Sequence, residues 1–529
     1  MKRIAGVVCG VGLMGLSSCG GGGSSSAPPP SGAVTPTLNV SLSENSGSVT
    51  VAEGDVATLG FNATFTGSSN DPIVADIQID GDQFELANEV TQSGNAFSVN
   101  ITSRRFLPAQ EGEARITFRL CTSSSCSTVY PGSTRTYTVS FDFNLNDWEQ
   151  FQRDADHTGY VPVRYDPDRF AFAWDYTDTF PDGRVRPSAA TEGIVYTTFA
   201  RNGGSAYDGT ARVIAFDSAD GSIIDTFDFG DQFHISGPSL SGNGLHFAAT
   251  ELGGQDGIWV LNRENLSFRD LLAFEVQFVD FEQPSIEGER IYFSGGDQGG
   301  QTWSFDAAAG TTLWRSFSDN FGIWGGQVLS YDENSIYNYR GSVLEVLDKA
   351  TGTLTATVAD PAFEVGLDYE AATVPDGEGR LLLFSGDKRF LGSNQLIAIS
   401  LENLNILWRT TAQYSTAFAL RDGIIYAVRQ DARVLSAINA ADGSVLWSTR
   451  LPETPNQFGE DPLVGNVIVT ENLAFASSAS KTWAIDIEDP EHPIVWEADT
   501  GGRLTLTPDN LLLTTNVPFD AKLTAYRLN

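Results

Sequence analysis

The stretch Leu435-Ser-Ala-Ile-Asn439-Ala-Ala-Asp-Gly443-Ser-Val-Leu-Trp447 decides the fold of this chain. It predicts a strand, a tight turn and a second strand, because Asp-Gly is a favoured turn pair and glycine accepts a positive φ. The pattern recurs along the chain. Its other copies contain Asp217 with Gly221, Asp306 with Gly310 and Trp314, Asp348 with Gly352, and more loosely Asn262, Ser400 with Trp408, Asp486 with Trp496, and Arg527.

The spacing of these copies indicates a β-propeller. Positions equivalent to Asn439 recur at a mean spacing of about 44 residues, which is typical of four-stranded propeller blades. The eight copies therefore predict eight blades around a central channel. We interpret Asp, Asn and Gly of the motif as structural residues. The tryptophans Trp314, Trp408, Trp447 and Trp496 are expected to pack between neighbouring blades, since a buried indole covers a large area.

Two further patterns describe how the ring begins and closes. Residues 170–176 have strand character, and the last copy ends before its blade is complete. We therefore expect these residues to supply the missing strand and to join the two ends of the domain. Short apolar stretches after Pro187, Pro238, Pro284 and Pro462 are predicted to be the innermost strands that line the channel.

The copies resemble the PQQ-like β-propeller repeat, whose core is Ala-x-Asp-x-x-Thr-Gly-x-x-x-Trp. Asp348 to Gly352 carries its Asp-x-x-Thr-Gly part. Upstream, Trp148-Glu-Gln-Phe-Gln-Arg-Asp-Ala-Asp-His157-Thr-Gly-Tyr160 resembles the opening segment of the same family, and we expect it to fix the chain at the start of the ring. The resemblance covers residues 148–529. The family includes quinone-dependent dehydrogenases and also non-enzymatic scaffolds. For the dehydrogenases it implies a calcium-bound quinone under a vicinal disulfide, and this chain has no Cys-Cys pair.

The N-terminus predicts export and lipidation. Residues 1–18 have a basic start and a short apolar run, which is typical of a signal peptide. Leu16-Ser-Ser-Cys19-Gly20 resembles a bacterial lipobox, so that Cys19 would carry the lipid. Gly20 after the cysteine implies an outer-membrane location, facing the periplasm or the cell surface. Residues 19–35, rich in Gly, Ser and Pro, are predicted to be a tether.

Residues 36–145 predict a separate immunoglobulin-like β-sandwich, and residues 148–529 the propeller, so the chain is expected to be all-β. Short alternating runs support the sandwich, at 38–43, 48–52, 57–65, 73–79, 114–120 and 136–143. Four residues lie between Cys121 and Cys126, enough for a hairpin tip, which predicts a disulfide in an exported chain. A cysteine-based metal site is the alternative, but no further ligand lies nearby in the sequence.

Charge and motifs restrict the function. The net charge is −35, and removal of Lys2 and Arg3 with the signal takes it to about −37. Such acidity argues against binding to nucleic acid. The four histidines form no HExxH motif, and no Gly-x-Ser-x-Gly motif occurs, so we predict no catalytic residues, no metal and no cofactor.

The predicted function is a non-enzymatic envelope lipoprotein that acts as a scaffold for other envelope proteins. The propeller and lipobox resemble BamB-type lipoproteins of outer-membrane protein assembly, although the sandwich departs from that family. One alternative is a quinone-dependent oxidoreductase with PQQ and calcium. Another is a surface module that binds polysaccharide or protein.

The sequence Phe321-Gly-Ile-Trp324-Gly-Gly provides the candidate partner-binding residues. It follows the strand near Trp314 and precedes the next inner strand, so its loop should lie around the channel mouth. Phe321 and Trp324 are predicted to contact a partner, because tryptophan is enriched at binding hot spots. The alternative is that both rings fold back and fill the channel or a seam between blades.

Lipidation can be tested by substitution. Cys19→Ala should move the protein from the membrane fraction to the soluble fraction, because the thiol that carries the lipid is lost. Fractionation followed by immunoblotting measures this. Cys9→Ala is the control, since Cys9 lies within the signal peptide and should leave the distribution unchanged. A Cys19→Ala protein that stays in the membrane fraction would contradict the prediction.

Overall fold

The computed structural model describes residues 35–179, 183–201, 210–232, 234–250, 256–275, 283–297, 299–319, 327–363, 371–386, 394–415, 417–453, 461–516 and 521–529. These residues form β-strands and one short 3-10 helix, η1 (Pro167–Arg169). Two sheets lie in the N-terminal part and eight sheets follow them, which confirms the all-β class. No helix within these ranges has the length and hydropathy needed to cross a membrane.

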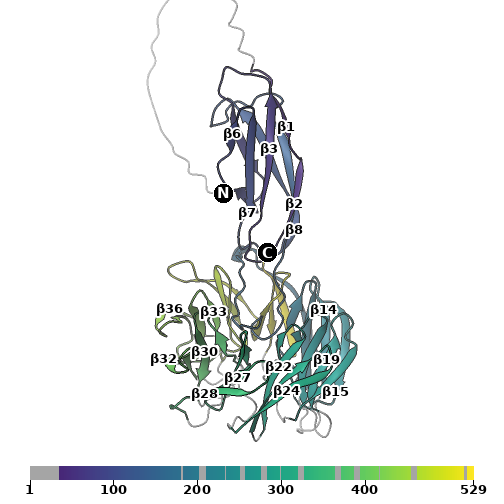
Figure 1. Ribbon diagram of the computed structural model, residues 1–529, viewed down its shortest axis with the longest axis vertical. Coiled ribbons are helices and arrows are strands. Elements are labelled where there is room, and N and C mark those ends of the chain that lie inside the picture. The colour runs from purple at the N-terminus through teal and green to yellow at the C-terminus, as the bar shows by residue number, and fades with distance from the viewer. Residues whose placement is uncertain are drawn as a thin grey trace, which may run out of the picture.

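The N-terminal part is a sandwich that stands on the propeller (Figure 1). One sheet contains β1 (Asn39–Leu42), β3 (Thr58–Thr66), β7 (Ala96–Ser103) and β5 (Phe84–Leu86), with β6 (Thr91–Ser93) also beside β7. The other contains β2 (Ser46–Val51), β9 (Arg135–Phe143), β8 (Gln110–Cys121) and β4 (Val74–Ile79). Alternate residues point inward, and aromatic pairs join the sheets. Ring centroids lie 5.8 Å apart for Phe97 and Phe118 and 4.6 Å apart for Phe61 and Tyr137.

The sandwich contains strands that the sequence reading missed. β7 lies inside its sheet and buries Phe97, Val99 and Ile101, although its period of two was visible in the sequence. β2 pairs with β9 in parallel, whereas the other strand pairs of the sandwich are antiparallel.

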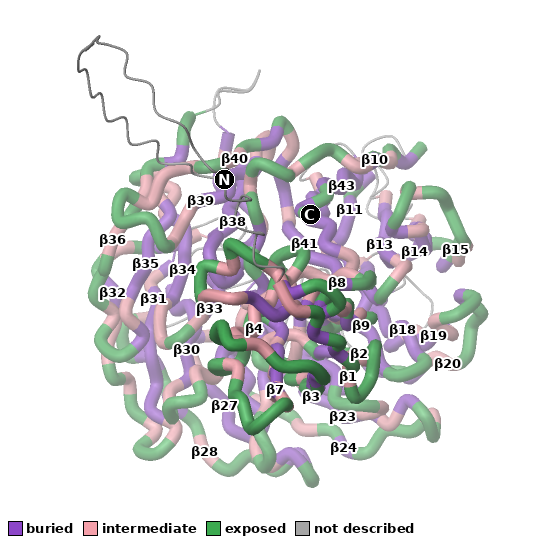
Figure 2. Tube along the Cα trace, turned by 90° about the horizontal axis from the view of Figure 1, so that it is seen from above, coloured by how far each residue is buried: buried purple, intermediate pink, exposed green. Residues whose placement is uncertain are grey.

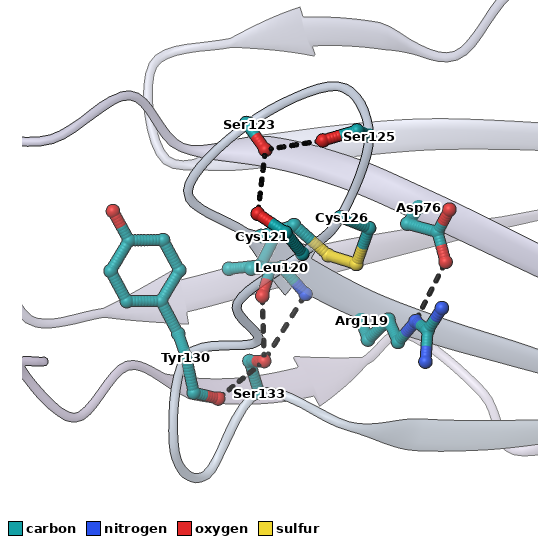
Figure 3. Close-up of a disulfide and its surroundings, with 10 residues drawn as sticks. Asp76, Arg119, Leu120, Cys121, Ser123, Ser125, Cys126, Tyr130 and Ser133 are labelled. Carbon is teal, nitrogen blue, oxygen red and sulfur yellow. Dashed lines mark hydrogen bonds and ion pairs between the residues drawn. A yellow bond between two sulfur atoms is a disulfide. The ribbon is translucent and has the colours of Figure 1, made fainter. Parts of the chain in front are cut away.

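The two ends of the sandwich have different roles. At one end, the described part of the chain begins beside the hairpin of the disulfide, since Leu38 N donates to Pro131 O at 3.0 Å and Cys121 is bonded to Cys126. Figure 3 shows this disulfide near Asp76 and Arg119, which form an ion pair at 2.6 Å. At the other end, Ala109 contacts Asn510 of the propeller. The twelve residues of β8 join these ends and span about 40 Å.

Each of the eight later sheets is an antiparallel meander, which we call a blade and number in chain order. Blade 1 contains β11 (Gly183–Val185), β12 (Ala189–Thr191), β13 (Ile194–Arg201), β14 (Thr210–Asp217) and β15 (Ile223–Gly230). Blade 2 contains β16 (His234–Ile235), β17 (Ser239–Leu240), β18 (Gly244–Thr250), β19 (Gly257–Asn262) and β20 (Phe268–Ala273). Blade 3 contains β21 (Ser285–Glu287), β22 (Arg290–Asp297), β23 (Gly299–Asp306) and β24 (Thr311–Ser318), and blade 4 contains β25 (Ser330–Tyr331), β26 (Ser335–Arg340), β27 (Val343–Asp348) and β28 (Leu354–Ala359).

Blades 5 to 8 continue the ring around the sandwich axis (Figure 2). Blade 5 contains β29 (Val374–Pro375), β30 (Arg380–Ser385), β31 (Asn394–Ser400) and β32 (Ile406–Tyr414), and blade 6 contains β33 (Ala419–Arg421), β34 (Ile424–Arg429), β35 (Val434–Asn439) and β36 (Val445–Arg450). Blade 7 contains β37 (Ile468–Val469), β38 (Leu473–Ser477), β39 (Thr482–Asp486) and β40 (Ile494–Ala498). Blade 8 contains β41 (Arg503–Leu506), β42 (Leu511–Thr515) and β43 (Lys522–Arg527), with β10 (Ala171–Thr177) outside β43.

The ring closes as expected, through the strand predicted at residues 170–176. β10 pairs antiparallel with β43 and gives blade 8 its outer strand. The prediction for the inner strands holds for Pro187, Pro238 and Pro284 but is wrong for Pro462. In blade 7 the inner strand is β37, and Leu463 forms only an isolated bridge with Ser478. Between Pro462 and β37 the chain instead forms isolated bridges, Leu463 with Ser478 and Asn466 with Ala417, so the inner strand begins later than in the other blades.

The repeated motif joins neighbouring blades. Asn439 Oδ1 accepts from Ala441 N at 2.9 Å, and Gly443 N donates to Asn439 O at 2.8 Å, which closes the turn after β35. Gly443 has a φ of +73°, and a Cβ there would lie 2.7 Å from the Trp408 indole of the preceding blade. Trp408 Nε1 donates to Ala440 O at 3.0 Å, so the indole is both packed and hydrogen-bonded across the seam.

Other copies repeat this arrangement. Trp314 Nε1 donates to Lys349 O at 3.1 Å, and Trp174 Nε1 donates to Ser218 O at 2.9 Å. Trp447 stacks on His492 of the next blade with ring centroids 4.0 Å apart, and Trp496 lies 5.3 Å from Tyr526. The turns of the remaining copies carry Asp217 with Gly221, Asp306 with Gly310, Asp348 with Gly352, and Asp486. The motif therefore stabilises the seams between blades.

The contribution of the seam contact to stability can be separated from that of the turn by comparing substitutions at two glycines. Gly443 and Gly423 share a φ of +73°, but only Gly443 faces an indole, because nothing lies within 4 Å of a Cβ on Gly423. Both Gly443→Ala and Gly423→Ala should lose roughly 1–2 kcal/mol for the left-handed backbone. Gly443→Ala should lose about 1–3 kcal/mol more, from overpacking against Trp408. Urea unfolding measures both, and equal losses would contradict the proposed seam.

Candidate functional site

Residues 148–161, which we call the hub segment, lie at the centre of the ring, between the sandwich and the inner strands. Trp148, Gln150, Gln152 and His157 are all buried, although three of the four have polar side chains. A polar side chain that is buried this deeply needs hydrogen-bond partners. The segment finds its partners on the blades around it.

Backbone hydrogen bonds connect the hub segment to inner strands of four blades. They join Trp148 to Ala190 (2.9 and 3.0 Å), Leu240 N to Glu149 O (2.7 Å), Leu420 N to Thr158 O (2.7 Å), and Val469 N to Gly159 O (2.9 Å). These partners belong to blades 1, 2, 6 and 7. The hub segment therefore pairs with inner strands from opposite sides of the ring.

Two glutamines and a histidine extend these contacts. Gln150 accepts from Ile286 N at 2.8 Å in blade 3. Gln152 Nε2 donates to Phe418 O at 2.7 Å and to Val467 O at 3.1 Å, next to the inner strands of blades 6 and 7. Gln150 thus adds blade 3, with which the backbone of the segment forms no hydrogen bond, and Gln152 adds to the backbone contacts with blades 6 and 7.

His157 is fully buried within the hub segment. Its Nδ1 lies 2.7 Å from Phe151 O and its Nε2 lies 3.0 Å from Leu329 O, beside the inner strand of blade 4. The imidazole thus links a tight turn of the hub segment to the ring. This placement agrees with the expectation that the segment fixes the chain at the start of the ring.

The other side of the hub segment holds the sandwich. Arg153 forms an ion pair with Glu53, and both side chains are nearly excluded from solvent. Arg153 also donates to Tyr160 O at 2.7 Å. Next to it, burial raises the pKa of the Asp154 carboxyl, while the charges of Arg153 and His157 act in the opposite direction. The hub segment is therefore the joint between the two parts of the molecule.

A small pocket lies against the hub segment. Its walls are Trp148, Phe151, Gln152, Pro187, Gln283, Gly465, Asn466, Arg503 and Leu504. Most of the wall residues outside the hub segment precede their inner strands. Those strands run toward turns such as the one at Asn510, which contacts the sandwich. The pocket consequently lies on the side of the hub segment that faces away from the sandwich.

The polar walls of the pocket are held in place by their neighbours. Asn466 Nδ2 donates to Gln152 Oε1 at 2.6 Å, and Leu504 N donates to Asn466 Oδ1 at 2.7 Å. Gln283 Nε2 donates to Pro238 O at 2.6 Å. These residues are far apart in the sequence and carry no motif, so sequence reading missed the pocket. The only signal was the resemblance of the segment that begins at Trp148.

The predicted site residues do not gather at this pocket. Cys19, Phe321 and Trp324 lie outside the described residues. Cys121 and Cys126 form their disulfide at the far tip of the sandwich, and the blade-motif residues lie at the seams. Asp76 approaches the two sulfur atoms, a neighbour that the sequence did not indicate, but the bonded sulfurs leave no thiolate for a metal.

The donor set of the pocket does not fit a calcium-bound quinone. Calcium takes oxygen ligands and favours carboxylates. Among the described wall residues there is no carboxylate and no cysteine, and the side-chain polar groups are amides and the Arg503 guanidinium. No reaction step is therefore derived through such a group.

The fold and the hub define a propeller protein with PQQ-like repeats, and comparison with known proteins agrees. Residues 304–527 match a family model described as "Outer membrane protein assembly factor BamB". The C-terminal blades are thus similar to the repeats of this family. No curated protein sequence matches the chain.

Three solved structures are similar to this chain at low sequence identity, and the first of them supports the propeller fold. Quinohemoprotein alcohol dehydrogenase from Comamonas testosteroni is 13% identical, covers 72% of this chain and 80% of its own, and has a TM-score of 0.50. AztD from Citrobacter koseri is 10% identical over 74% of this chain and 92% of its own, with a TM-score of 0.36. The propeller domain of the Trilobed protease from Pyrococcus furiosus is 12% identical over 60% and 97%, with a TM-score of 0.34.

The structural role of the hub segment predicts a large effect for Gln152→Met. Methionine keeps a similar volume but leaves Phe418 O, Val467 O and Asn466 Nδ2 without this partner. Unsatisfied buried groups should lower the free energy of unfolding by at least about 2 kcal/mol. Thermal unfolding measures the loss. Gln413→Met, at an exposed position on β32, is the control and should have little effect. Equal melting temperatures for the two variants would contradict the role of the hub segment.

Proposed function

We propose that the chain is a non-enzymatic lipoprotein of the bacterial outer membrane that binds other envelope proteins with the propeller face opposite the sandwich. One observation carries this proposal. The described chain begins at the tip of the sandwich, whereas the pocket lies on the side of the hub segment that faces away from the sandwich. An anchor at Cys19 would thus hold the pocket away from the membrane.

The joint between sandwich and propeller supports this orientation. Besides the buried Arg153–Glu53 pair, Asn510 Nδ2 donates to Ala109 O at 2.9 Å and Arg164 N donates to Phe106 O at 2.8 Å. These contacts come from three places on the propeller. They restrict rotation of the propeller on the sandwich, so the sandwich acts as a spacer of about 40 Å and not only as a link.

The family match is one support for a scaffold. The matched family model is described as an assembly factor, and its description applies to that protein. The similarity to a quinohemoprotein dehydrogenase, at 13% identity, concerns the fold. A quinone-dependent oxidoreductase has the weaker support, because the described pocket walls offer no carboxylate for calcium. Binding of one or more envelope proteins remains the function that the geometry supports best.

Photo-crosslinking in cells tests the proposed face. Asp231 and Asp220 are exposed and lie beyond opposite ends of the same outer strand, β15 (Ile223–Gly230). p-Benzoylphenylalanine in place of Asp231 should give discrete cross-linked bands, because this end faces away from the sandwich. The same replacement at Asp220, on the sandwich side, should give few or none.

The comparison is made on the lipid-anchored full chain by immunoblotting. Bands from the Asp220 position without bands from Asp231 would reverse the proposed orientation. An absence of bands from both positions would contradict binding of envelope proteins by this face.

A further inference from the structure

Asp76, Cys121 and Cys126 meet at the tip of the sandwich that lies away from the propeller. A carboxylate oxygen and the two sulfurs all lie within 4.8 Å of one another, and no other such group of three occurs among the described His, Cys, Asp and Glu side chains. Asp76 lies on β4 and Cys121 at the end of the neighbouring strand β8, so the sequence did not show that they meet. Cysteine sulfur and carboxylate oxygen are both ligands that zinc uses in proteins.

The two sulfurs are bonded to each other in the structure, so they become ligands only when the disulfide is reduced. Cys126 is half-buried between the exposed residues Ser125 and Ser127, whereas Cys121 is fully buried. The sulfur of Cys126 is therefore the one that a small dithiol can attack. Exchange passes two electrons and two protons to the cysteines, which become thiols, and the dithiol is oxidised to its own disulfide.

We expect the hairpin to keep its shape after reduction, because hydrogen bonds close it independently of the disulfide. Thr122 N donates to Thr128 O at 3.0 Å, and Tyr130 N donates to Leu120 O at 2.9 Å. At the base of the hairpin, Ser133 Oγ accepts from Leu120 N at 3.1 Å (Figure 3). The two thiols should therefore stay close to each other and to the carboxylate, as a preorganised metal site requires.

Arg119 holds this carboxylate in place. Its Nε donates to Asp76 Oδ2 at 2.6 Å, and the carboxylate has a second oxygen for a metal ion (Figure 3). Carboxylates that bind metals are commonly hydrogen-bonded in this way. Two thiolates and the carboxylate carry three negative charges, which one zinc ion and the Arg119 guanidinium balance. Ligand atoms about 2.3 Å from a tetrahedral zinc ion lie roughly 3.8 Å apart, which agrees with the spacing of this group.

We propose that the reduced hairpin binds one zinc ion through Cys121, Cys126 and Asp76, with water in the fourth position. Thiolate sulfur favours zinc over calcium and magnesium, which take oxygen ligands. Binding displaces the two thiol protons, which are released to solvent. The tip thus exchanges a disulfide for a metal ion according to the thiol–disulfide balance around it. This site is independent of the proposed function, because it lies on the sandwich tip and not on the propeller face.

Zinc titration of the full chain by calorimetry tests the site. In the mature chain that the lipobox predicts, Cys121 and Cys126 are the only cysteines that reduction can turn into thiols. The chain is measured oxidised, reduced with a phosphine, and reduced and then alkylated, with excess calcium present to occupy sites made of oxygen ligands. Only the reduced chain should bind one zinc ion, at least about tenfold more tightly than the other two preparations bind zinc.

Asp76→Asn distinguishes the proposed site from a simple pair of thiols. The amide keeps an oxygen that accepts from Arg119 but is a weaker, uncharged ligand, so the reduced variant should bind zinc at least about tenfold more weakly. Asp80→Asn, at an exposed position just after the same strand β4, is the matched control and should bind zinc like the unaltered chain.

Equal zinc binding by the reduced and the alkylated chain would overturn the proposal. An Asp76→Asn chain that binds as tightly as the unaltered chain, or an equal loss in Asp80→Asn, would overturn it as well. Circular dichroism checks that the reduced chain stays folded, and unfolding on reduction would also count against the site, because the site needs the hairpin. The comparison of oxidised, reduced and alkylated chain needs no variant, so a variant that fails to fold does not prevent the test.

Discussion

The structure depends on the hydrogen bonds that the hub segment forms with the inner strands. Inner strands of a propeller are short, and β17, β25, β29 and β37 contain two residues each. Such strands have few partners of their own, so a central segment with many donors and acceptors stabilises them. The backbone of the segment is strained, because Gln152, Arg153 and His157 adopt positive φ angles. Strain of this kind, about 1–3 kcal/mol per residue, persists where surrounding contacts determine the backbone.

The hub segment and the seams both stabilise the ring, but at different places. Hub contacts act at the centre, where Gln152 touches two blades and His157 a third. The Trp–Gly contacts of the motif act nearer the rim, between adjacent blades. Because both sets are buried and specific, the ring forms a stiff frame. The sandwich covers one face of this frame, and the pocket opens on the side of the hub that the sandwich does not cover.

Most of the fold could be predicted because it repeats. The motif around Asn439 and Gly443 encodes a turn and a seam locally, so its spacing predicted the blades, and the unfinished last copy predicted the pairing of β10 with β43. The site could not be predicted in the same way. Gln283, Gln152 and Asn466 meet only after the ring has closed, and each is an ordinary polar residue in its local sequence. The prediction after Pro462 was wrong because it relied on a local pattern. Prolines do precede other inner strands, but in blade 7 the inner strand begins later, at Ile468.

The pairing of β10 with β43 also has a consequence for biosynthesis. Ala171 pairs with Arg527, so the first strand of the propeller can pair only after the last strand has been synthesised. The sandwich needs only residues 39–143 and can fold early, whereas the ring depends on contacts of very long sequence separation, which form slowly. Until β43 arrives, β10 and the eighth sheet present unpaired edges, which are prone to aggregation. Ring closure therefore acts as a check of completeness, because a truncated polypeptide keeps those edges exposed to proteases and chaperones.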